Sequence, residues 1–143
     1  MKTSTDLLRH SICAVIGSAG LSVALSVFAD DITGEDELLC YGMHAAVCTR
    51  DETCETMEPS KLNLPDFIEL DLSAGIATTT DEVSEKRETP IENMRRNDGI
   101  IMLQGMQGEW AFSWVIVEAT GRGTLTIGSA DEGATIFTTC TVD

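Results

Sequence analysis

The chain has 143 residues, of which 24 are acidic and 9 are basic, so its formal net charge is −15 at pH 7. A surface this acidic repels phosphate backbones and anionic lipid headgroups, which argues against nucleic acid and bare membrane as partners. Cationic proteins, basic peptides or divalent cations fit the charge better, and the simplest interpretation is that the charge keeps the protein soluble.

The first 29 residues have the three parts of an export signal. Lys2 and Arg9 give a short basic start, residues 11–28 form an uncharged run, and Ala29 closes a small-residue cleavage site. We predict cleavage after Ala29. The alternative is a retained membrane anchor, because an uncharged run of eighteen residues is close to the length that spans about 30 Å of hydrocarbon.

Cleavage would leave 114 residues with seven basic and 23 acidic side chains, a net charge of −16. This length suits one domain. We predict an acidic flexible arm over residues 30–37 and a single β-rich domain over residues 38–143. The mature protein is expected to be periplasmic or secreted, with no stable membrane insertion once the signal is removed.

Four cysteines remain after the predicted cleavage, and an even number in a small exported domain predicts two disulfides. Of the three possible pairings we favour Cys48 with Cys54, which closes a tight loop, and Cys40 with Cys140, which ties the first strand to the last. A zinc site is the alternative, but the thiolates lack the usual close spacing and His44 is the only histidine left. We therefore expect no metal and no cofactor.

The elements predicted along the chain are mainly strands. Residues 38–48 are apolar enough for a strand or a short helical turn, and residues 67–72 alternate between apolar and acidic side chains before a turn and a return strand at 76–80. Residues 81–97 are charged and contain Pro90, which predicts a long exposed excursion with an edge strand near Glu88 to Glu92.

The C-terminal third repeats the pattern of strand, glycine turn and strand at spacings of about 8–12 residues, which is typical of a β-meander, sandwich or small barrel. The segments concerned are 100–103, 109–119, 124–127 and 135–142. The predicted fold class is therefore all-β: a small antiparallel meander, barrel or sandwich, held together by two disulfides.

One predicted strand carries both tryptophans of the chain. Trp110, Phe112, Trp114 and Ile116 recur at every second position and so share one face. We favour this stripe as the main wall of the core, because the domain has few other large side chains. The three aromatic residues are also candidate binding residues, since indole faces stack well on sugars and apolar ligands.

Arg95 and Arg96 form an adjacent basic pair in the mature chain. They are candidate contacts for an anion or a partner. The alternative is that they are exposed and pair locally with Glu92 or Asp98, an interaction that contributes little to stability.

The sequence contains no catalytic motif, and we predict no catalytic residue. His44 has no G-x-S-x-G nucleophile to serve, and with so many acids a close carboxylate pair arises by chance. The acidic clusters do not match a calcium-binding loop.

The order of the cysteines is similar to that of a known group of sequences. Three near the mature N-terminus (Cys40, Cys48 and Cys54), the alternating segment 67–72 and the near-terminal Cys140 resemble the framework of small, uncharacterised exported proteins of proteobacteria. The resemblance implies a periplasmic β-rich domain. It transfers no functional residue, because these proteins have no settled activity.

The leading functional hypothesis is a non-enzymatic binding or accessory module of the bacterial envelope, whose acidic face engages a basic protein or peptide. The surplus of acids, the β-architecture and the lack of a catalytic constellation motivate it. Two alternatives stay open: a small periplasmic hydrolase that uses a carboxylate pair, and a barrel-type carrier that holds a small apolar ligand against Trp110 and Trp114.

Overall fold

The computed structural model describes residues 30–62, 67–79 and 86–143. The predicted signal peptide lies outside these residues. The described chain forms one antiparallel sheet of ten strands, and it contains a short 3-10 helix but no α-helix. This confirms the all-β prediction.

The strands are joined in the order β5-β4-β3-β1-β10-β9-β8-β7-β6, and the short β2 pairs with β1. Their bounds, with that of the 3-10 helix η1, are β1 (Glu37–Thr49), β2 (Glu55–Met57), η1 (Pro59–Leu62), β3 (Phe67–Asp71), β4 (Ile76–Thr79), β5 (Glu88–Pro90), β6 (Asn93–Asn97), β7 (Ile100–Gln107), β8 (Trp110–Val117), β9 (Arg122–Gly128) and β10 (Glu132–Val142).

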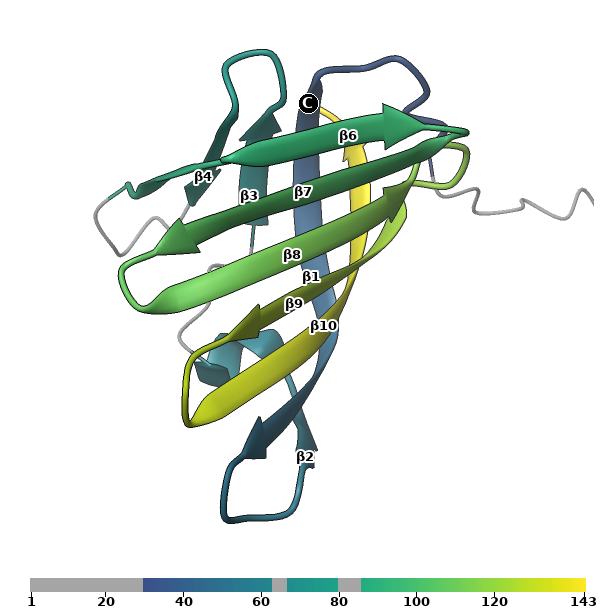
Figure 1. Cartoon of the computed structure of the whole chain (residues 1–143). Coiled ribbons are helices and arrows are strands. Elements are labelled where there is room, and N and C mark those ends of the chain that lie inside the picture. The colour runs from purple at the N-terminus through teal and green to yellow at the C-terminus, as the bar shows by residue number, and fades with distance from the viewer. Residues whose placement is uncertain (1–29, 63–66, 80–85) are drawn as a thin grey trace, which may run out of the picture.

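The sheet curls into a half-barrel, so that β6, β7 and β8 run across β1 and β3 (Figure 1). Its two outermost strands, β5 and β6, are separated in the chain by Ile91 and Glu92 alone. The Ile91 N–H donates to the Gly75 carbonyl (2.8 Å) and the Glu92 N–H to the Gln104 carbonyl (2.9 Å). Residues 88–97 therefore belong to both ends of the sheet and hold it in its curled form.

The edge strand predicted near Glu88 to Glu92 is present as β5, but the prediction of a long excursion over residues 81–97 missed β6, which pairs with β7. Residues 80–85 lie outside the described residues. Pro90 is compatible with pairing here because β5 is an outermost strand, where a missing N–H costs little. The charged side chains obscured the pairing, since β6 exposes all five of its residues.

The two disulfides have the predicted pairing. Cys40 on β1 lies directly opposite Cys140 on β10 and is bonded to it, and both are buried. Cys48 is bonded to Cys54 and closes the loop between β1 and β2. Disulfides of this kind are compatible with an oxidising, extracytoplasmic location.

The core lies between the two halves of the curled sheet. Its buried side chains come from β1 and β3 on one side and from β7 and β8 on the other, including Leu38, Leu70, Ile101 and Trp114. Apolar burial on this scale provides most of the folding energy. One further apolar residue, Ile32, precedes the first strand and is fully buried in the same cluster.

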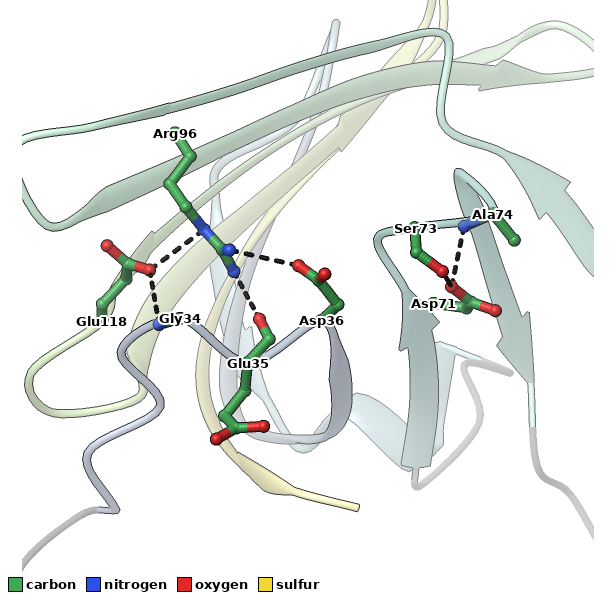
Figure 2. Close-up of polar contacts among 8 residues, drawn as sticks. All are labelled: Gly34, Glu35, Asp36, Asp71, Ser73, Ala74, Arg96 and Glu118. Atoms are coloured by element: carbon green, nitrogen blue, oxygen red, sulfur yellow. Dashed lines mark hydrogen bonds and ion pairs between the residues drawn. The ribbon is translucent and has the colours of Figure 1, made fainter.

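Residues 30–36, which we call the arm, lie across the end of the half-barrel where β8 and β10 terminate. The Ile32 N–H donates to the Glu118 carbonyl (2.9 Å). Arg96 of β6 forms ion pairs with Asp36 (3.1 Å) and Glu118 (3.0 Å) and donates to the Glu35 carbonyl (Figure 2). The flexibility predicted for residues 30–37 stays a prediction, but these contacts attach the arm to the sheet.

Candidate functional site

A cavity of about 360 Å³ lies at the opposite end of the half-barrel from the arm, which we call the cavity end. Small-molecule sites in proteins start at about 300 Å³. Most of its lining is apolar and comes from seven strands and η1. The described lining residues are Leu62, Ile68, Ala77, Thr79, Arg87, Thr89, Gln107, Trp110, Ala111, Phe112, Trp114, Leu125, Ile127, Glu132, Gly133 and Ala134.

The floor of the cavity is a fully packed layer of the core, which we call the middle layer. Its members face each other across neighbouring strands: Leu103 on β7 pairs with Trp114 on β8, which pairs with Leu125 on β9, which pairs with Ile136 on β10. None of them is more than 6 % exposed. Four large side chains fill the half-barrel at this level.

The next layer toward the cavity end, the outer layer, contains smaller residues. At the same strand positions it has Gly105, Phe112, Ile127 and Ala134. A side chain on Gly105 would start 2.6 Å from the Phe112 ring and 2.5 Å from the Pro90 carbonyl, so only glycine lets the ring lie against β7. The Phe112 ring takes the space beside Gly105, whereas Ala134 on β10 leaves empty the volume that Ile136 fills one layer deeper.

The mouth of the cavity carries its polar groups. Trp110 is 36 % exposed at the start of β8, and Gln107, Arg87 and Glu132 line the same space. Neither Arg87 nor Glu132 forms an ion pair or a side-chain hydrogen bond with any described residue. The cavity therefore has an aromatic wall and a mouth with two charges that the described part of the protein leaves unmatched.

The structure brings together the three aromatic candidates predicted from the sequence. Trp110, Phe112 and Trp114 line the cavity at three successive depths, and the stripe continues into the core with the fully buried Ile116. Trp114 belongs to both regions: its Nε1–H donates to the Thr138 hydroxyl (3.0 Å) inside the core. The stripe is thus a core wall at the arm end and a cavity wall at the other, and its binding role stays a prediction.

The two basic candidates lie elsewhere. Strand alternation places Arg95 and Arg96 on opposite faces of β6. Arg96 pairs with Glu118 and Asp36 rather than with its near neighbours in the chain, and Arg95 is exposed opposite Met102. Neither residue lines the cavity.

Sequence reasoning missed the charged residues of the mouth. Glu132 shares its inward-facing side of β10 with Ala134 and Ile136, two and four residues further along. That spacing was available in the sequence, but the predicted strand began at Thr135 and so excluded it. Arg87 had no comparable signal, because it precedes a strand of only three residues.

The shifted carboxyl groups lie away from the cavity. Hydrogen bonds from the Thr33 side chain and backbone hold the pKa of Asp31 below its ordinary value, and the Ala74 N–H and Ser73 hydroxyl do the same for Asp71 (Figure 2). Asp31 is exposed and precedes a turn, and Asp71 is the partly exposed last residue of β3. Neither shift is in the direction that a general acid needs.

Metal-binding side chains do not gather in the described ranges: no three His, Cys, Asp or Glu residues there are placed to hold an ion. His44 is exposed on β1, beside an irregularity in its pairing with β10. No helix in the described part of the chain is long and apolar enough to cross a membrane.

No protein-family model, curated protein or solved structure matches the chain. A functional proposal must therefore come from the geometry of this molecule. The cavity is the one feature that combines a hollow, an aromatic wall and unmatched polar groups among the residues described.

Proposed function

We propose that the protein is a non-enzymatic binding protein of the cell envelope, periplasmic or secreted, that holds a small and largely apolar ligand in the cavity. The observation that carries the proposal is the cavity of about 360 Å³ walled by Trp110, Phe112 and Trp114. The two disulfides support export to an oxidising compartment.

The gain from binding is the removal of apolar surface from water. Each Å² of apolar surface that a ligand covers is worth about 25 cal/mol, and it covers the cavity wall and its own surface at once. The wall is already positioned, because the middle layer beneath it is packed and the Phe112 ring lies in the space that Gly105 leaves free beside β7. A ligand therefore loses little affinity to ordering of the protein.

Tryptophan fluorescence provides a specific test, since both tryptophans of the chain line the cavity. We expect decan-1-ol to produce a saturable fluorescence change with one site per molecule in the purified, oxidised protein. Ala134→Leu fills the outer layer and should weaken binding about tenfold or more. Thr135→Leu adds similar bulk to the neighbouring residue, which faces away from the cavity, and should leave binding unchanged.

A second variant covers the case in which Ala134→Leu does not fold. Trp110→Ala removes part of the wall at a partly exposed position and should weaken binding severalfold, followed through Trp114. A fluorescence signal that does not saturate, or equal affinities of the Ala134→Leu and Thr135→Leu proteins, would contradict the proposal.

A further inference from the structure

We infer that the ligand carries a cationic group, such as a protonated or quaternary amine, which Glu132 and Trp110 receive at the mouth of the cavity. This inference rests on the proposed function, and it names the chemical class of the ligand: a cationic amphiphile whose apolar part occupies the outer layer.

The register of the sheet places Glu132 and Trp110 at the same level. Ala111 of β8 pairs with Gly128 of β9, which pairs with Gly133 of β10. Trp110 and Glu132 each lie one residue beyond this row, toward the cavity end. They are two strands apart, so their backbones are separated by roughly 10 Å. Both residues line the cavity, and a small ammonium group fits within this span.

The surroundings of Glu132 favour a positive charge. Its side chain lines the cavity, the residue is partly buried, and its carboxylate has no hydrogen-bond or ion-pair partner among the residues described. A ligand in the cavity would cover Glu132 and remove its carboxylate from water, and a cation is the group that offsets the cost of this best. The face of a neighbouring tryptophan adds a cation–π attraction.

The charge of the whole molecule acts in the same direction. With 24 acidic against 9 basic residues, the field around the protein concentrates cations at its surface and repels anions. Arg87 is the only basic residue among the described lining residues and would favour an anion instead. It is exposed, and exposed charges act weakly because water screens them. The attraction of a cation to Glu132, to the aromatic wall and to the negative field is therefore stronger than the attraction of an anion to Arg87.

Three ligands with the same tail and different heads test the inference: decyltrimethylammonium, decan-1-ol and decanoate, each titrated below its micelle concentration and followed by tryptophan fluorescence. We expect the ammonium compound to bind about tenfold tighter than the alcohol, and decanoate to bind weakest. Equal affinities for the ammonium compound and the alcohol would overturn the inference and leave the proposed function standing. Tightest binding of decanoate would also overturn it, in favour of Arg87. If none of the three binds, the proposed function itself fails.

A pair of charge variants tests whether the preference for a cation comes from the Glu132 carboxylate or from the overall negative charge of the protein. Glu132→Gln should reduce the preference for the ammonium compound over the alcohol to about onefold. Glu109→Gln removes the same charge from the exposed turn before Trp110 and should preserve the preference. A loss of preference that is equal in the two variants, or absent from both, would overturn the assignment to Glu132.

Discussion

Glu118 and Arg96 form the most deeply placed ion pair among the residues described. The Glu118 side chain is only 6 % exposed, whereas Arg96 is 31 % exposed and reaches it from β6. The same carboxylate accepts from the Gly34 N–H (3.4 Å), and the same guanidinium contacts Asp36 and the Glu35 carbonyl. One arginine therefore joins β6, the end of β8 and the arm.

We expect Arg96→Met to lower the free energy of unfolding by about 2–4 kcal/mol, because it leaves the buried Glu118 carboxylate without its cation. The measurement is urea unfolding followed by circular dichroism. Arg95→Met is the matched control: it removes the same charge from the neighbouring residue on the exposed face of β6, and its effect should stay within about 0.5 kcal/mol. Equal losses in the two variants would mean that net charge, rather than this ion pair, is responsible.

At the scale of single elements, the turn between β3 and β4 depends on the last residue of β3. The Asp71 carboxylate accepts hydrogen bonds from the Ala74 N–H (2.8 Å) and the Ser73 hydroxyl (2.7 Å) (Figure 2). Gly75 follows with a φ of 69°, a conformation that favours glycine, and its carbonyl accepts from the Ile91 N–H. The turn thus also fixes the segment that closes the half-barrel.

These hydrogen bonds hold the pKa of Asp71 below its ordinary value of 3.8, with the Ala74 N–H as the largest cause. A carboxyl with a lowered folded-state pKa stabilises the fold above pH 3.8, and this contribution is lost as the pH falls through the lower value. We expect a carboxyl-carbon NMR titration to place the midpoint of Asp71 below 3.8. Ser73→Ala should raise it only part of the way, because the Ala74 bond remains. A midpoint at or above 3.8 in the unmodified protein would contradict this account.

At the scale of the whole molecule, the sequence predicted what depends on local pattern. Two-residue alternation gave the face shared by Trp110 and Trp114, and cysteine number with loop length gave both disulfide pairings. The cavity could not be predicted in this way. The cavity exists because of the residues that lie in the same layer as Phe112 in the folded sheet. These residues belong to other strands, and the register in which the strands pair cannot be read from the sequence.

The same limit applies to the closure of the sheet and to Arg96. Closure depends on Ile91 and Glu92, two residues in a segment whose charge hides its pairing. Glu118 is one acid among 24, and nothing in the neighbouring sequence marks it as the partner of Arg96. Contacts between common residue types that lie far apart in the chain could therefore not be predicted from the sequence.

The two disulfides constrain the chain on very different scales, which leads to a prediction about overall stability. Cys40 and Cys140 are 100 residues apart, and Cys48 and Cys54 only 6. In the chain-entropy model the long link stabilises by about 4.7 kcal/mol and the short one by about 2 kcal/mol, because a longer closed loop removes more freedom from the unfolded chain. A domain of this size has a free energy of unfolding of about 5–15 kcal/mol, so the protein without the long disulfide would keep only a small part of it.

We therefore expect the Cys40→Ala/Cys140→Ala protein to unfold at a much lower urea concentration than the Cys48→Ala/Cys54→Ala protein, with circular dichroism as the measurement. Alanine is the suitable replacement because the first pair is buried, where a serine hydroxyl would need a partner. The long link also joins β1 to β10 at the centre of the sheet order, between the half that bears β3 and the half that bears β8. If the two variants were equally stable, the pairing of β1 with β10 would already be fixed without the covalent bond, and stability would reside in the core and in the segment 88–97 that joins the outermost strands.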